Sequence, residues 1–335
     1  MNELLSITCK RIALFSAVSF LIICAIQPLR ADVWNVTAGA QSGDKARQAL
    51  GFLPNEVWIH VGDTIQWTFG SDEIHTVTFL TSNLPRPPLF DALHNFIGCP
   101  GVGVTPSGSS FNNSSCVTSV PSTTGQTYSV TFPTPNSYKL VCLVHPDMTG
   151  LIHVLSSSSS LPHDQAFYDH EAQTQREVLI AGASNLTGPG STAEEGTVTA
   201  GISAIISTGG GAQTASLTRF LQSQIVIKVG DTVEWTSRDA SIPHTITLGA
   251  EPADPRAPSS NVSMSFDGAR QALIGSPSDS VNSGILVPTT QDRPGLVESP
   301  PGATRFRVTF MVPGVFNYIC ALHDNLGMTG TVIVH

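Results

Sequence analysis

Charged residues are scarce in this 335-residue sequence, where Asp, Glu, Lys and Arg together make up 12%. The chain also lacks basic runs, and its formal net charge is −9. Both features disfavour nucleic acid or an anionic membrane as a partner. Long apolar runs are missing as well. The one extended run, Ile12–Ile26, is short for a membrane span.

The N-terminus has the features of a secretory signal peptide. Lys10 and Arg11 precede the apolar run, and Ala31 offers a small-residue cleavage site. An uncleaved anchor is the alternative. We therefore predict a signal peptide over residues 1–31, a periplasmic or extracellular protein, and no membrane insertion after cleavage.

The remaining chain favours β structure in two copies. Hydrophobic residues make up 41% of the sequence, and Gly, Pro, Ser and Thr are abundant, which is typical of short strands joined by turns. Alternating residues flank a Gly-Asp turn in Glu56–Thr68, and the same pattern recurs in Gln224–Thr236. Val36-Thr37-Ala38-Gly39 likewise resembles Val198-Thr199-Ala200-Gly201. These matches indicate duplication of one β domain.

Composition places the linker between the two copies. A serine tract, 156–160, leads into 164–180, where a short helix is predicted to follow. Its expected face carries Phe167, His170, Thr174 and Val178. The predicted organisation is domain 1 at 32–155, a linker at 156–195 and domain 2 at 196–335.

Two further segments look irregular from composition alone. Gly188–Gly211 is rich in Gly, Ser and Thr, which predicts a mobile loop or a hairpin tip. Pro252–Pro301 reads as a long insertion interrupted by prolines, with little regular structure expected.

The six cysteines fall into three pairs. Two leave with the signal peptide, and two lie in a repeated motif described below. Only Cys99 and Cys116 remain, and an exported protein is expected to join them in a disulfide. A metal pair is the weaker alternative, because the spacing is wide and no His is placed between them.

The repeated motif concentrates potential metal ligands in one short loop. Cys142, His145 and Met148 recur near the C-terminus as Cys320, His323 and Met328. An upstream His precedes each loop. Two imidazoles, a thiolate and a weak thioether form the set expected of a blue-copper site. Zinc, the alternative metal, is disfavoured by the Met. The two predicted ligand sets are His75, Cys142, His145, Met148 and His244, Cys320, His323, Met328.

Each half resembles a cupredoxin of the plastocyanin, amicyanin and azurin group. The resemblance rests on the Gly-Asp turn, the aromatic strand before Cys and the closing Met-Thr-Gly. The Cys-x2-His-x2-Met loop resembles amicyanin, and the Cys-x2-His-x4-Met loop resembles plastocyanin. The resemblance implies an all-β chain of two tandem Greek-key β-sandwich domains with two type 1 coppers. An exposed edge of one ligand His is then the expected port for electrons.

One departure from that group lies beside each site. Thr76 and Thr245 stand directly after the upstream His, where many members carry an Asn that steadies the Cys loop. Their hydroxyl groups are expected to serve in its place.

Three functions compete for such a chain. Copper oxidases and nitrite reductases are also built from cupredoxin domains, but their second kind of copper needs further His ligands. Here Val141 and Ile319 precede the two motif cysteines, and no His-x-His pair occurs. Copper storage is disfavoured by the five Met, whereas delivery stays open as an alternative. The sequence therefore predicts an exported electron carrier, not an enzyme, that exchanges electrons with unidentified redox proteins.

Overall fold

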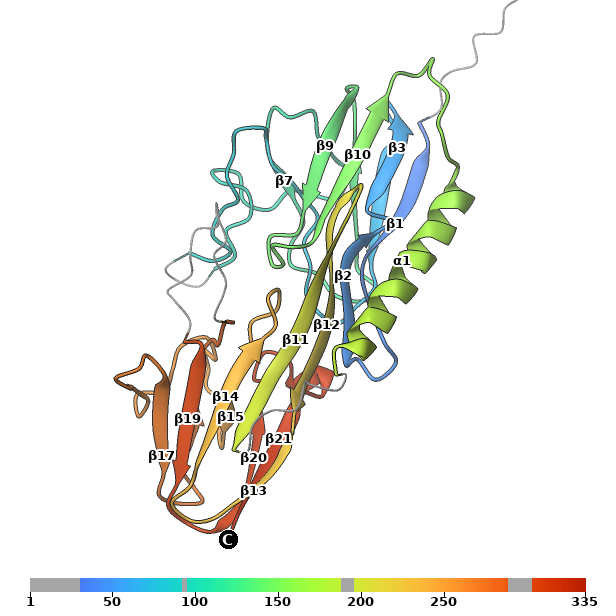
Figure 1. Cartoon of the computed structure of the whole chain (residues 1–335). Coiled ribbons are helices and arrows are strands. Elements are labelled where there is room, and N and C mark those ends of the chain that lie inside the picture. The colour runs from blue at the N-terminus through green and yellow to red at the C-terminus, as the bar shows by residue number, and fades with distance from the viewer. Residues whose placement is uncertain (1–30, 92–94, 188–195, 289–302) are drawn as a thin grey trace, which may run out of the picture. The chain divides into compact units, whose positions relative to one another are not determined.

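The computed structural model describes residues 31–91, 95–187, 196–288 and 303–335. The predicted signal peptide, apart from its last residue, and His94 lie outside these ranges. No helix in the described part of the chain has both the length and the apolar character that a bilayer span requires. The described residues form a mostly β structure with one long helix between the two repeated halves (Figure 1).

Each half is a sandwich of two sheets. In the first half, one layer contains β1 (Val33–Gln41), β2 (Arg47–Leu53), β4 (Thr64–Phe69), β6 (Ser109–Ser110) and β8 (Thr127–Thr131). The facing layer contains β3 (Glu56–His60), β5 (Thr78–Phe79), β7 (Val117–Thr118), β9 (Asn136–Val141) and β10 (Thr149–Leu155). The predicted Gly-Asp turn therefore carries the chain from one layer to the other, because it joins β3 to β4.

The second half repeats this arrangement. One layer contains β11 (Thr197–Thr208), β12 (Gly211–Leu221), β14 (Thr232–Arg238), β16 (Ser263–Met264), β17 (Arg270–Ile274) and β19 (Arg305–Phe310). The facing layer contains β13 (Gln224–Ile227), β15 (Thr247–Leu248), β18 (Val281–Asn282), β20 (Gly314–Ile319) and β21 (Thr329–Val334). A buried tryptophan lies in the core of each half, Trp67 in the first and Trp235 in the second.

The two halves share one continuous sheet. β2 and β12 pair antiparallel, with Ala49 opposite Ala215. The layer that contains β2 and the layer that contains β12 therefore form a single sheet of eleven strands among the described residues. The edges of both domains are thereby paired, which removes two exposed strand edges. The domains are therefore joined by backbone hydrogen bonds as well as by the linker.

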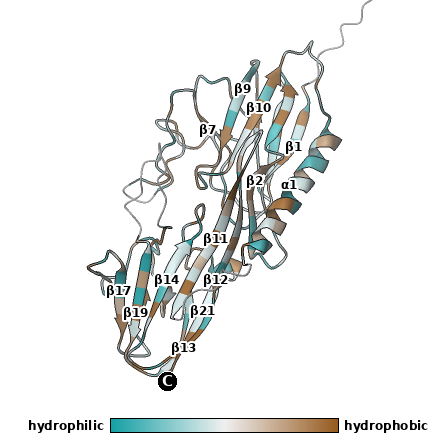
Figure 2. Cartoon of the chain, viewed as in Figure 1, coloured by the Kyte–Doolittle hydropathy of each residue, from teal (hydrophilic) through white to brown (hydrophobic). Residues whose placement is uncertain are grey.

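Helix α1 (Gln165–Asn185) covers this joint (Figure 1). It begins at Asp164, whose carboxylate accepts a hydrogen bond from the backbone N–H of Phe167 at 2.9 Å. Leu179 and Ala183 pack against Ala49 and Ala215, the residues that face each other across the paired strands. Figure 2 shows that α1 carries both strongly hydrophobic and strongly hydrophilic residues.

The predicted helix exists, but its predicted face is wrong. The helix ends at Asn185 rather than Ile180, and Phe167 and Val178 are 41% and 55% exposed. The buried residues are instead Tyr168, Leu179 and Ala183. The prediction failed because the packing face is determined by residues of distant strands, such as Ala49 and Ala215, against which Leu179 and Ala183 pack.

The hydroxyl group of Tyr168 makes two backbone hydrogen bonds. It accepts from the N–H of Trp58 at 2.8 Å and donates to the carbonyl of the same residue at 3.0 Å. Trp58 lies on β3, which is an edge strand among the described strands and pairs only with β10. We expect Tyr168→Phe to lower the free energy of unfolding by about 1–3 kcal/mol, because both backbone groups lose a buried partner.

Denaturant unfolding measures this effect. Val178→Ala on the exposed face of the same helix is the control, with an expected change within about 0.5 kcal/mol. Equal effects of the two substitutions would show that the Tyr168 hydroxyl does not anchor the helix.

Two segments are more regular than their composition suggested. Residues 197–208 are strand β11, which pairs antiparallel with β12, so the predicted hairpin tip is confirmed for the turn at 209–210, and 188–195 lie outside the described residues. In the proline-interrupted insertion, β17 pairs parallel with β19 and extends the sheet, while 289–302 are not described. Composition did not indicate these strands, because β11 buries a continuous run and β17 is short and mostly not buried.

The predicted disulfide is present. Cys99 and Cys116 are bonded, with 5.7 Å between their Cα atoms, and both are buried.

Candidate metal centres

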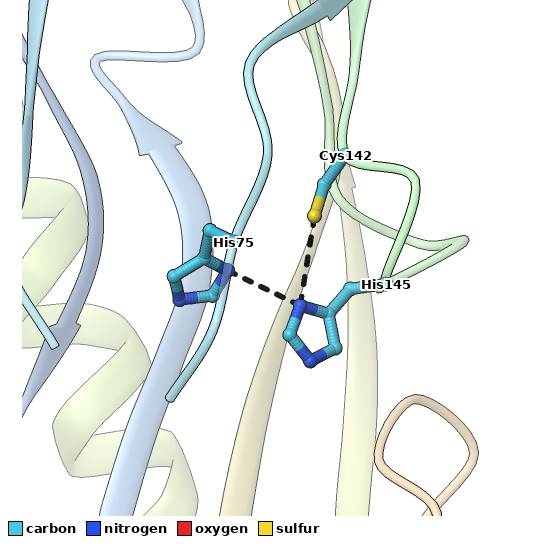
Figure 3. A group of neighbouring side chains, drawn as sticks. All are labelled: His75, Cys142 and His145. Atoms are coloured by element: carbon cyan, nitrogen blue, oxygen red, sulfur yellow. Dashed lines mark hydrogen bonds between the residues drawn. The ribbon is translucent and has the colours of Figure 1, made fainter. Parts of the chain in front are cut away.

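The first centre lies where two loops of the first half meet. His75 lies between β4 and β5, and Cys142 follows the last residue of β9. His145 comes from the loop between β9 and β10. Figure 3 shows the three side chains pointing toward one another. His145 Nδ1 lies 3.1 Å from His75 Nδ1 and 3.7 Å from Cys142 Sγ.

The second centre repeats the first. Cys320 Sγ lies 3.3 Å from His323 Nδ1 and 3.8 Å from His244 Nδ1. In each centre the potential ligand atoms all lie within 4.8 Å of one another, and all six residues are buried. No other group of three or more His, Cys, Asp or Glu residues in the described part of the chain has this geometry.

The backbone orients each thiolate. The N–H of Thr76 donates to Cys142 Sγ at 3.3 Å, and the N–H of Thr245 donates to Cys320 Sγ at the same distance. The hydroxyl oxygen of Thr76 accepts a hydrogen bond from the N–H of Leu143 at 2.7 Å. That of Thr245 accepts one from the N–H of Ala321 at 2.9 Å. The two threonines therefore steady the Cys loops, as the sequence predicted.

Both methionines are fully buried and belong to the same cores as the cysteines. The carbonyl of Met148 accepts a hydrogen bond from the N–H of Cys142 at 3.0 Å, and Met328 holds Cys320 in the same way. These bonds close each ligand loop on itself. They hold each methionine next to the cysteine of its own centre.

The electrostatics of each centre favour a thiolate beside imidazoles. Burial raises the pKa of the Cys142 thiol, but hydrogen bonds from His145 and His75 outweigh it and hold the pKa well below its ordinary value. Burial also raises the pKa of the Cys320 thiol, but the charge of His323 and hydrogen bonds from His244 and His323 outweigh it and hold the pKa well below its ordinary value. For His145, burial opposes the charged form, but the Cys142 thiolate and a nearby carboxylate raise the pKa to about 9.

This donor set fits copper. A soft thiolate with two imidazoles and a nearby thioether suits copper better than zinc. An oxygen atom lies near the outer nitrogen of every ligand His, which is the usual arrangement of a metal-bound imidazole. Ser71 Oγ lies 2.9 Å from His75 Nε2, and Asp239 Oδ2 lies 3.5 Å from His244 Nε2, too far for a good hydrogen bond.

Comparison with known families agrees with this geometry. The model of copper-binding proteins of the plastocyanin/azurin family matches residues 40–155 and again 208–335, more than half of the chain. The chain belongs to the plastocyanin/azurin family. Its two domains are cupredoxin domains, each with a type 1-like copper site.

Solved structures of cupredoxins are also similar. A Cu(I) form of an amicyanin mutant is 19% identical, with a TM-score of 0.24, over 37% of this chain and 82% of that one. Oxidised plastocyanin from Dryopteris crassirhizoma is 19% identical, with a TM-score of 0.22, over 42% of this chain and 99% of that one. No curated protein matches the chain.

The expected exposed His edge is absent from both cupredoxin sites. His145 is fully buried, and His323 is 5% exposed. Both point toward the joint, where their outer nitrogens contact the carboxylate of Glu73. The expectation came from single-domain proteins and failed because Glu73 of the first domain lies against both outer nitrogens, including that of His323 in the second domain.

A glycine packs against the ring of each upstream His. The sequence did not predict this contact. Gly39 and Gly201 have positive φ angles of 71° and 68° at irregularities in β1 and β11. A Cβ atom on Gly39 would lie 2.2 Å from His75 Nε2, and one on Gly201 would lie 2.0 Å from His244 Nε2. The repeated Val-Thr-Ala-Gly was the only signal in the sequence.

Proposed function

We propose that this cupredoxin is an exported electron-transfer protein with two type 1 copper centres. The observation that carries the proposal is the repetition of a buried His-Cys-His group beside a Met in both domains. Bound copper would supply one-electron chemistry between Cu(I) and Cu(II). The chain itself would exclude water from the six buried His and Cys ligands and hold them in place through the β framework.

In this proposal, Met148 and Met328 would hold the copper weakly through their thioethers. Each lies directly before the strand that follows its ligand loop, β10 or β21, and is fixed by the hydrogen bond from the cysteine N–H to its carbonyl.

Catalysis at a second kind of copper is disfavoured by the residues present. In the described chain, only the two type 1-like groups have a metal-ligand arrangement. Copper delivery is disfavoured because exchange of a ligand with a partner requires exposure, and the six ligands are buried. An electron carrier needs neither a substrate pocket nor ligand exchange.

Export is supported by the signal-like N-terminus and by the disulfide. The partners in this proposal are redox proteins of the same compartment. The low content of basic residues argues against nucleic acid.

The two centres are expected to differ in reduction potential. The outer nitrogen of His244 faces a buried carboxylate, Asp239, where that of His75 faces the neutral hydroxyl group of Ser71. A negative charge near a ligand favours Cu(II), so the second centre should have the lower potential. We expect a separation of about 60 mV or more, a tenfold bias for a one-electron couple.

Voltammetry of the protein with both sites filled tests this function. Two resolved one-electron waves are expected, and the proteins with Cys142→Ser or Cys320→Ser assign each wave to its domain. A single unsplit wave would contradict the difference in potential, and no reversible wave would contradict the electron-transfer function.

A further inference from the structure

A single buried carboxylate lies between the two metal centres. Glu73 Oε1 lies 3.2 Å from His145 Nε2, and Glu73 Oε2 lies 3.2 Å from His323 Nε2. The residue is 4% exposed. Both imidazoles turn their other nitrogen, Nδ1, toward the cysteine of their own centre. Each carboxylate oxygen therefore faces a ligand of a different domain.

This bridge has no counterpart from the second domain. Glu73 stands two residues before His75, and the residue two positions before His244 is Ile242. Ile242 is 1% exposed and packs into the core of the first domain. At these matching positions the first domain therefore supplies a carboxylate and the second an apolar side chain.

The upstream histidines offer no similar route. His75 contacts Ser71 and His244 lies near Asp239, so each has its oxygen neighbour within its own domain. Among the contacts of the described residues, the chain His145–Glu73–His323 is the one that leads from one ligand set directly to the other.

We propose that Glu73 couples the two copper centres, both as a positioning residue for His145 and His323 and as the hydrogen-bonded route for an electron between them. Each Nε2–H donates to one carboxylate oxygen, which leaves Nδ1 free for the metal. This inference rests on the proposed function. With copper bound in both centres, one electron would pass from the centre that holds Cu(I), which would become Cu(II), to the centre that holds Cu(II), which would become Cu(I). No proton leaves either imidazole, and no covalent bond changes.

Glu73→Gln tests the bridge with little change in volume. A glutamine offers one acceptor oxygen and one donor NH2 group, so it can satisfy only one of two N–H donors. We expect the copper affinity of at least one centre to fall about tenfold, as for other lost partners of metal-bound histidines. Electron exchange between the centres should also slow by about tenfold, because one hydrogen bond to a charged carboxylate is lost from the route.

Pulse radiolysis follows the exchange. One centre is reduced, and the redistribution of the electron is read from the visible bands. Glu56→Gln is the matched control, because Glu56 contacts His153 at 3.0 Å in the same domain and neither residue is a ligand. Exchange in this control should equal that of the wild type. An unchanged exchange rate and unchanged affinities in Glu73→Gln would overturn the bridge.

A measurement on the wild type covers the case in which Glu73→Gln does not fold. In the diamagnetic Cu(I) protein, nitrogen-15 NMR should show Nε2–H signals of His145 and His323 that are both protected from solvent exchange. Absence of either signal would overturn the proposal. Failure of the proposed function has a different signature, since the wild type would then lack the thiolate-to-copper band altogether.

Discussion

Replacing Cys320 with serine is expected to remove one of two copper ions and to leave the other centre fully coloured. Cys320 is the only sulfur anion of its centre and is completely buried. A serine hydroxyl is a harder ligand that is not ionised at neutral pH, so the site loses both its affinity for copper and its visible band. The bound copper and the absorbance should each fall by about half.

The fold should survive this substitution. Serine is close to cysteine in size, and its oxygen can accept the hydrogen bond that Thr245 N–H donates to Cys320 Sγ at 3.3 Å. Cys142→Ser is the mirror experiment, because Thr76 makes the same contact in the first domain. Metal analysis and an absorption spectrum measure both outcomes. Loss of all colour from either variant would show that the two centres are not separate sites.

Adding one methyl group at Gly39 or Gly201 should also empty a copper site. In either position the new Cβ would overlap the ring of the upstream His, at 2.2 Å from His75 Nε2 or 2.0 Å from His244 Nε2. The ring must leave its place, and the centre loses a ligand. Strain from the positive φ adds about 1–3 kcal/mol, and the overpacked core costs about as much again.

The chain provides a control for each glycine. Gly62 and Gly230 have φ angles of 93° and 96°, and a Cβ atom on either would meet nothing within 4 Å. Gly62→Ala and Gly230→Ala therefore carry the backbone strain without the clash, and both should keep two copper ions. Copper content and denaturant unfolding separate the two effects. Full copper binding by Gly39→Ala and Gly201→Ala would contradict the assigned role of these glycines.

The sequence predicted the parts of this protein that depend on short-range pattern. Alternation around the Gly-Asp turn identified strands β3 and β4 and their copies, because a sandwich strand buries every second residue. The repeated Cys, His and Met identified the ligand loops, since all three residues of each loop lie within a few positions of one another. The upstream histidines followed from the alignment of the two halves.

The sequence did not predict how the two domains meet. The pairing of β2 with β12 joins two strand edges, and nothing in a local pattern indicates which edges will pair. The helix that covers the joint was placed correctly along the chain, but its packing face depends on the small residues Ala49 and Ala215 in distant strands.

The burial of His145 and His323 depends on that same joint. Because no local pattern showed the joint, the sequence predicted an exposed edge. Glu73 was missed for the same reason. Nothing local distinguishes this carboxylate from its acidic neighbour Asp72, which pairs with Lys45 at 2.7 Å. Only the meeting of the domains brings Glu73 between two ligand histidines.

A copper titration followed by absorption spectroscopy tests the central claim most directly. We expect the metal-free protein to take up two copper ions per chain and to develop an intense visible band, from thiolate-to-copper charge transfer, in proportion to both additions. Uptake of copper without this band, or a band that is complete after one copper ion, would contradict the assignment of two type 1 centres.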